Sequence, residues 1–141
     1  MRSGGRRDGV STLAGVAVTG VWSALRVPLW LRGRRWTELL SPPAGVAPGR
    51  VPPRGAGRAA RGAVKVLSAV PGSPWRNTCL YRSVAECLAL RSYGIPAVVR
   101  IGVRAGDRPG ETPILAHAWV VTDPDAEPAP PDRMQPFALR A

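Results

Sequence analysis

The spacing of apolar residues changes from helical to strand-like near residue 95 of this 141-residue chain. Before that point, apolar residues recur every three or four positions, between stretches rich in Pro and Gly. After it, β-branched residues gather in two short runs. The pattern predicts four helices and then two strands, at residues 13–26, 29–40, 58–70, 78–93, 97–103 and 114–122. Helices followed by paired strands indicate an α+β fold.

The two front helices have plausible starting residues. Ser11 or Thr12 can cap the first, and Pro28 suits the first turn of the second. The apolar run at residues 10–25 follows a basic start, as in a signal peptide, but two glycines interrupt it and no clean cleavage site follows. A packed or membrane-surface helix is therefore favoured over a membrane span or a secretion signal.

The last helix and the two strands define the other half of the chain. Gly94 is placed to end the helix, and the polar loop at residues 105–110 would join the strands as an antiparallel hairpin. Strand alternation puts His117 and Trp119 on one face, together with two large aliphatic residues, and small residues on the other. We expect the helix at residues 78–93 to cover the face with the large residues.

Composition divides the chain in the same way. The sequence predicts a basic helical region at residues 1–57, which ends in a Pro/Gly-rich linker at residues 41–57. A predicted core follows at residues 58–141. Residues 1–76 carry thirteen basic and two acidic side chains, a net charge of +11, whereas residues 77–141 carry seven of each. The basic half suits docking of an acidic peptide, an acidic protein or anionic lipid, and equally an ordinary solvated surface.

Cys79 is the strongest candidate for chemistry. It follows a Pro/Gly-rich loop and opens the predicted helix, where the helix dipole and the unpaired backbone N–H groups favour thiolate over thiol. His117, the chain's one histidine, lies on the second strand and is the usual kind of partner for such a nucleophile. The pair indicates a cysteine acyl-transfer enzyme, although a cysteine is more often inert packing.

Cys87 differs from Cys79 in its position. It lies in mid-helix, away from any helix end, and is expected in the core. Eight helical residues separate the two sulfur-bearing residues by about 12 Å, which is too far for a disulfide. Two unpaired cysteines fit a reducing cytoplasm. One histidine and two separated cysteines do not form a zinc ligand set, so neither a metal nor a cofactor is expected.

Further candidates complete a possible site. The Cys79 backbone N–H can stabilise an oxyanion, and Asn77 is either a second donor or only a helix cap. A carboxylate should orient the imidazole of His117. Asp132 is favoured because a strand returning after the turn could bring it beside His117, whereas Asp123 and Asp125 flank a proline and resemble turn formers. All three aspartates remain candidates.

A Cys-Leu-Xaa-Arg-Ser motif at residues 79–83 precedes an Ala-His-Ala-Trp-Val strand at residues 116–120. With the intervening Ile-Gly-Val-Arg strand, this arrangement resembles the leader peptidases of lasso-peptide biosynthesis, within the transglutaminase-like cysteine peptidases. The resemblance covers about residues 74–137, and the Trp- and Arg-rich helices before it are similar to the family's helical front portion. It implies a transglutaminase- or papain-like core, with the nucleophile helix packed on a small antiparallel sheet.

The resemblance also implies a function. The protein would be a cytoplasmic cysteine peptidase that cleaves the leader from a ribosomally made precursor, with Cys79 as nucleophile and His117 as base. The third residue does not carry over from the family, because four prolines at residues 124–131 lengthen the segment where its aspartate usually follows a short turn. Asp132 is chosen on the strand argument alone. Its partners would be the precursor, a separate leader-recognition protein and an ATP-dependent macrocyclase. Transglutaminase-like transfer to an amine is the alternative enzyme. A basic module that binds peptide, nucleic acid or membrane is the non-enzymatic alternative, although no nucleic-acid motif is present and membrane contact is not favoured.

Overall fold

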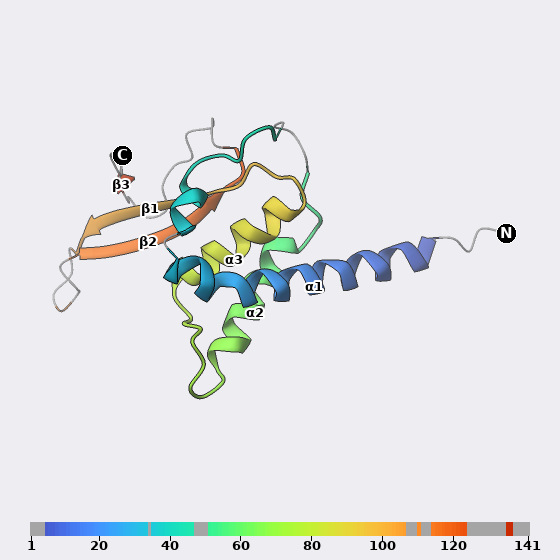
Figure 1. Ribbon diagram of the computed structural model, residues 1–141, viewed down its shortest axis with the longest axis horizontal. Coiled ribbons are helices and arrows are strands. Elements are labelled where there is room, and N and C mark those ends of the chain that lie inside the picture. Colours follow the sequence, from blue (N-terminus) through green and yellow to red (C-terminus); the bar gives the residue numbers. More distant parts are fainter. Residues whose placement is uncertain are drawn as a thin grey trace.

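The computed structural model describes residues 5–33, 35–46, 51–106, 110, 114–123 and 135–136. Within these residues, three helices, a short 3-10 helix and three strands follow one another (Figure 1). Their bounds are α1 Gly5–Arg32, η1 Arg35–Leu40, α2 Ala56–Ser68, α3 Cys79–Ser92, β1 Val98–Ala105, β2 Ile114–Val121 and β3 Gln135–Pro136. The order of helices and then strands confirms the predicted α+β fold.

The front of the chain is one long helix rather than two. α1 begins at Gly5, ahead of the predicted caps, and continues through Pro28, after which only the 3-10 turn of η1 follows. A proline inside a helix leaves the carbonyl four residues earlier without its usual donor. That carbonyl belongs to Ala24, and the indole Nε1 of Trp75 donates to it at 2.8 Å. The replacement donor satisfies the carbonyl that Pro28 leaves free.

α1 and α2 pack closely. A Cβ atom on Gly20 would lie 2.8 Å from the backbone carbon of Ala59, so only glycine permits this approach. One hydrophobic cluster contains buried side chains of α1, η1, α2, α3 and β1, among them Val27, Leu39, Val64, Val84 and Val99. This core extends across residue 57, where the sequence predicted a division between two regions.

α3 lies at the centre of the fold. It contacts α1, α2, η1, β1 and β2. Gly94 follows its end at a φ of 73°, which glycine adopts without strain, and the N–H groups of Gly94 and Ile95 donate to Arg91 and Leu90. The predicted helix end is therefore confirmed. α2 begins two residues before its predicted start, with Gly55 in the left-handed conformation ahead of it.

The strands form an antiparallel sheet in the order β2-β1-β3. Gly102 of β1 pairs with His117 of β2 on one side and with Pro136 of β3 on the other. The predicted hairpin of the first two strands is thus confirmed. A strand carrying Asp132 was expected to return beside β2, and Asp132 lies outside the described residues. The described part of the returning chain, β3, pairs with β1. Among the described residues, the outer edge of β2 has no partner strand.

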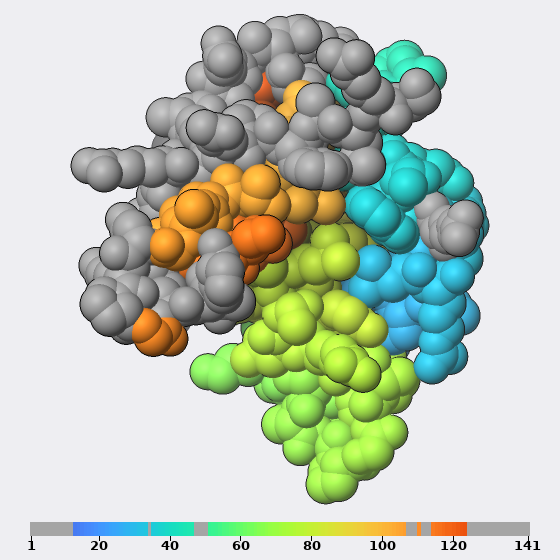
Figure 2. All heavy atoms as spheres, turned by 90° about the vertical axis from the view of Figure 1, so that its left-hand side faces the viewer, coloured from blue at the N-terminus to red at the C-terminus, as the bar shows by residue number. Residues whose placement is uncertain are grey.

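The face of β2 that meets α3 is the opposite of the one predicted. Ala118 is buried in the core and Val120 packs against it, whereas His117 and Trp119 point to the other face. The small side chain of Ala118 lets the strand approach α3 closely, so the larger residues are placed on the far side. Figure 2 shows the orange strands lying directly above the yellow-green residues of α3, with the cyan residues of η1 to one side.

Candidate active site

Cys79 is the first residue of α3, as the sequence predicted. Thr78 caps the helix in an extended conformation, and its side-chain oxygen accepts from the N–H of Tyr81 at 3.4 Å. A helix start of this kind presents unpaired N–H groups and the positive end of the helix dipole. Cys79 is partly exposed, so a molecule in the solvent can reach its sulfur.

The loop before Cys79 is anchored at several points. The Ser73 hydroxyl donates to the carbonyl of Leu67 at 2.8 Å and accepts from the N–H of Trp75. The Tyr81 hydroxyl donates to the carbonyl of Pro74 at 3.3 Å. Together with the bond from Trp75 to α1, these contacts fix the approach of the chain to α3. The position of Cys79 is therefore set by α1 and α2 as well as by its own helix.

Cys79 and His117 line one pocket of about 370 Å³. The other lining residues are Arg61, Arg82, Ser83, Glu86, Ala118, Trp119 and Val120. The four consecutive residues 117–120 point alternately to the two faces of the sheet, so they can share a pocket only along an edge of their strand. The pocket thus lies at the outer edge of β2. His117 reaches it from the face away from α3, and Cys79 reaches it from α3.

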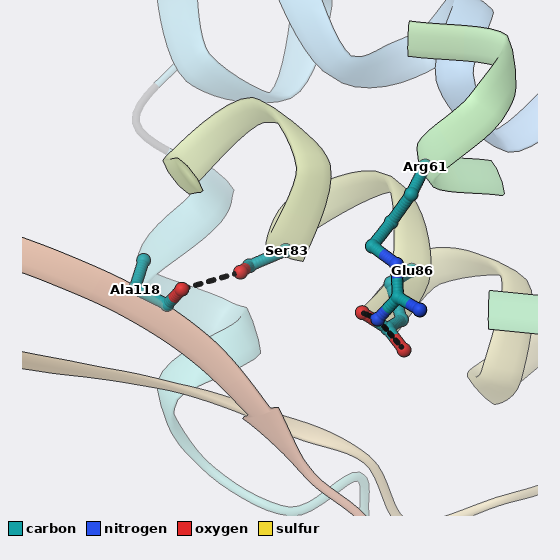
Figure 3. A network of polar contacts seen from close by, with 4 residues as sticks. All are labelled: Arg61, Ser83, Glu86 and Ala118. Atoms are coloured by element: carbon teal, nitrogen blue, oxygen red, sulfur yellow. Dashed lines mark hydrogen bonds and ion pairs between the residues drawn. The ribbon is translucent and has the colours of Figure 1, made fainter. Parts of the chain in front are cut away.

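A buried hydrogen bond joins the two elements that carry Cys79 and His117. The Ser83 hydroxyl donates to the backbone carbonyl of Ala118 at 2.9 Å (Figure 3). Ser83 follows Cys79 by one helical turn, on the same side of α3, and Ala118 follows His117 directly in β2. This contact therefore fixes the position of the helix that begins at Cys79 relative to the strand that carries His117.

The charged residues of the pocket are two arginines and one glutamate. Arg61 Nη1 contacts both carboxylate oxygens of Glu86, at 3.0 and 2.8 Å (Figure 3). Gly57 provides the space for this pair, since a Cβ there would collide with the Glu86 carboxylate. Because Arg61 neutralises Glu86, the exposed Arg82 leaves the pocket with a net positive charge.

Cys87, unlike the partly exposed Cys79, is a buried thiol. Its sulfur donates to the carbonyl of Ala97 at 3.3 Å, and its side chain belongs to the core. Desolvation by burial raises the pKa of Cys87 to about 12, against a smaller lowering by the nearby Arg91. Cys87 therefore stays protonated at neutral pH, which fits the core position predicted from the sequence.

Of the other predicted site residues, the structure describes Asn77 and Asp123. Asn77 is exposed and precedes Thr78, so the capping role belongs to Thr78 and not to Asn77. Asp123 is exposed just after β2, whereas Asp125 and Asp132 lie outside the described residues. In the part of the chain that the structure describes, no three His, Cys, Asp or Glu side chains gather as metal ligands.

Sequence reasoning did not give Ser83, Arg82 or Trp119 a role of its own. The rings of His117 and Trp119 stack at 6.3 Å between centroids, with 14° between their planes. The buried Nε1 of Trp119 has no hydrogen-bond partner among the described residues. The sequence feature that could have indicated these residues is their place within the two motifs, at residues 79–83 and 116–120. Their contacts could not be predicted, because they depend on how α3 packs against β2.

A helix that starts at a cysteine, packed on a small antiparallel sheet that carries a histidine, is the arrangement of an α+β domain of the transglutaminase-like kind. A family model described as the transglutaminase-like superfamily matches residues 21–138, and the chain belongs to this superfamily. Its members are commonly cysteine peptidases or acyltransferases. Neither a curated protein nor a solved structure gave a significant match.

Proposed function

We propose that this protein is a cysteine peptidase that removes the leader from a lasso-peptide precursor. The observation that carries the proposal is the common pocket of Cys79 and His117, with the cysteine at the start of α3. The superfamily supports acyl-transfer chemistry, and the motifs at residues 79–83 and 116–120 support the choice of leader peptide as substrate.

In the proposed reaction, His117 accepts the thiol proton of Cys79 and the thiolate attacks the carbonyl carbon of the scissile peptide bond. A sulfur–carbon bond forms, the oxyanion is stabilised by the backbone N–H of Cys79, and Asn77 is the second candidate donor. The carbon–nitrogen bond then breaks as His117 protonates the leaving amine. Water, deprotonated by His117, attacks the thioester and releases the leader carboxylate and the free thiolate.

A carboxylate is needed to hold the imidazole in the productive orientation. Asp132 is our proposal for this role, with Asp123 and Asp125 as the alternatives. Asp123 follows β2 by two residues and is close in sequence to His117. It is therefore included among the aspartates to be substituted. Substituting each aspartate separately distinguishes the three.

The partners follow from the proposed substrate. A separate leader-recognition protein would deliver the precursor, and an ATP-dependent macrocyclase would take the released core peptide. The positive charge that Arg82 adds to the pocket suits a substrate segment with an acidic side chain near the scissile bond.

The decisive experiment mixes the protein, a recognition protein and a precursor, and follows cleavage by mass spectrometry. Cys79→Ala and His117→Ala should each reduce the cleavage rate by at least about a thousandfold, because each removes a group that acts on the reacting atoms. Asp132→Ala should reduce it markedly. Cys87→Ala is the matched control, since it removes the thiol that the mechanism does not use, and should cleave normally.

Transfer of the acyl group to an amine is the alternative within the same superfamily. The same assay, run with added hydroxylamine or a small primary amine, separates the two reactions by product mass. Hydrolysis predicts a leader with a free carboxylate as the main product. A leader found chiefly as the amide would replace the peptidase proposal by acyl transfer, and full activity of Cys79→Ala would remove both.

A further inference from the structure

α1 has a second apolar face that nothing in the described structure covers. Its members are Val18, Val21, Trp22, Leu25 and Leu29, which recur at intervals of three and four residues and so lie along one side of the helix. Val18 and Leu29 are each 69% exposed, and Trp22 is 61% exposed. We call these five residues the outer stripe.

The opposite side of α1 is also apolar, and it is buried against the rest of the protein. Val16, Ala24 and Val27 belong to the core, and Gly20 touches α2. α1 is therefore apolar on both sides, and only one side is needed to hold the fold together. Exposing a stripe that includes a tryptophan has a cost in water, and this indicates that the stripe is covered when the protein functions.

Positive charge accompanies the outer stripe. Residues 9–37 contain four arginines and no acidic residue. Arg26 and Arg32 are exposed on the same helix. Arg35, just after the helix, lies 4.7 Å from the ring of Trp30 and pairs with Glu38 at 3.3 Å, so among the described residues the uncompensated charge beside the stripe is that of Arg26 and Arg32. An apolar stripe with a tryptophan, beside basic side chains, has the chemistry of helices that lie in the interface of an anionic membrane.

The helix is also apolar enough to span a membrane by composition, over Leu13–Arg32, but one such helix is weak grounds for a span. The packing favours a different arrangement. Insertion across a bilayer would remove Val16, Ala24 and Val27 from the core and break the contact between Trp75 and Ala24. A helix lying flat keeps all of these contacts and buries only the outer stripe.

We propose that the outer stripe of α1 docks the protein onto the surface of an anionic membrane, with α1 parallel to it. Leu29 and Trp22 enter the boundary between headgroups and acyl chains, and Arg26 and Arg32 contact lipid phosphates. This inference does not depend on the proposed peptidase activity, because it uses none of the residues that line the pocket.

The test is flotation of the full-length protein with vesicles of equal parts phosphatidylglycerol and phosphatidylcholine, compared with pure phosphatidylcholine. The protein should float with the anionic vesicles and bind the neutral ones much more weakly. Trp22→Ser with Leu29→Ser should weaken binding by at least about tenfold, from the lost apolar burial. Arg26→Gln and Arg32→Gln should each weaken it roughly fivefold, and added salt should act in the same direction.

A control is available at the end of α2, where Val66 and, two residues beyond the helix, Val70 are also exposed, at 69% and 55%. Val66→Ser with Val70→Ser also removes two exposed apolar side chains, although smaller ones, and should leave vesicle binding unchanged. Equal binding by the stripe variant and the wild type would overturn the proposal. So would sedimentation showing that the wild type is a dimer without lipid and the stripe variant a monomer, because a second copy would then cover the stripe.

Discussion

At the scale of the residue, the two cysteines show how position decides reactivity. Both lie on α3, two turns apart, yet one opens the helix beside a pocket and the other is buried against the carbonyl of Ala97. The sequence distinguished them because helix position alone separates Cys79 from Cys87. It left Asn77 with two possible roles, helix capping and oxyanion stabilisation, because an amide side chain just before a helix suits both. The structure gives the cap to Thr78.

Selective alkylation follows from this difference. Iodoacetamide at neutral pH should label Cys79 at least about tenfold faster than Cys87, because only a thiolate reacts and Cys87 stays protonated with a pKa near 12. Peptide mass spectrometry after timed quenching measures both rates in one sample. His117→Ala should slow the labelling of Cys79 and leave that of Cys87 unchanged. Equal rates at the two cysteines would contradict the assignment of the nucleophile.

Alkaline pH should destabilise the fold through Cys87. Burial raises its pKa from 9.0 to about 12, so between these values the folded state keeps a proton that the unfolded state loses. The stabilising effect is complete below pH 9 and declines as the pH rises toward 12. Urea unfolding at a series of pH values should show the free energy of unfolding falling more steeply in the wild type than in Cys87→Ala. Parallel curves for the two proteins would show that Cys87 does not titrate differently on folding.

At the scale of the element, the sequence predicted the helix that begins at Cys79 and the hairpin after it. Its predictions were wrong where they depended on how several elements pack together. The end of α3 at Gly94 and the pairing of β1 with β2 came from local signals. The face of β2 did not, because alternation shows which residues share a face and not which face meets the helix. Pro28 was read as a helix start, since the donor that replaces its lost hydrogen bond comes from distant Trp75.

Ser83 is a positioning residue in this arrangement, and its effect should fall on catalysis. Ser83→Ala removes the donor to Ala118, which holds α3 against β2. We expect kcat for precursor cleavage to fall by about tenfold or more with KM little changed, because the reacting groups are misaligned while substrate contacts remain. Ser83→Thr, which keeps the hydroxyl, should recover part of the rate.

Ser92→Ala is the matched control for Ser83→Ala. Ser92 also donates to a backbone carbonyl, that of Ala89, at the far end of α3. Both variants should lose about 1 kcal/mol of unfolding free energy, but only Ser83→Ala should lose kcat. An equal loss of kcat in the two variants, or none in Ser83→Ala, would show that Ser83 contributes only to stability.

At the scale of the whole molecule, one core joins the basic front of the chain to the half that contains Cys79 and His117. Composition and charge suggested a division near residue 57, because the linker and the change in charge are visible in the sequence. The contacts of Val27 and Leu39 with the core are not visible there, since they depend on tertiary packing. The amino-terminal part of α1 projects beyond the other elements (Figure 1), although its later turns lie within the core.

The hydrogen bond between Trp75 and Ala24 has a practical consequence for the smallest fragment that can work. A chain shortened to begin after α1 would retain Cys79, His117 and the whole sheet, and would resemble a complete catalytic unit. It would nevertheless lack the carbonyl that anchors the loop ahead of the nucleophile. Protease nicking within the last turns of α1 should therefore abolish the proposed peptidase activity without touching any residue of the pocket.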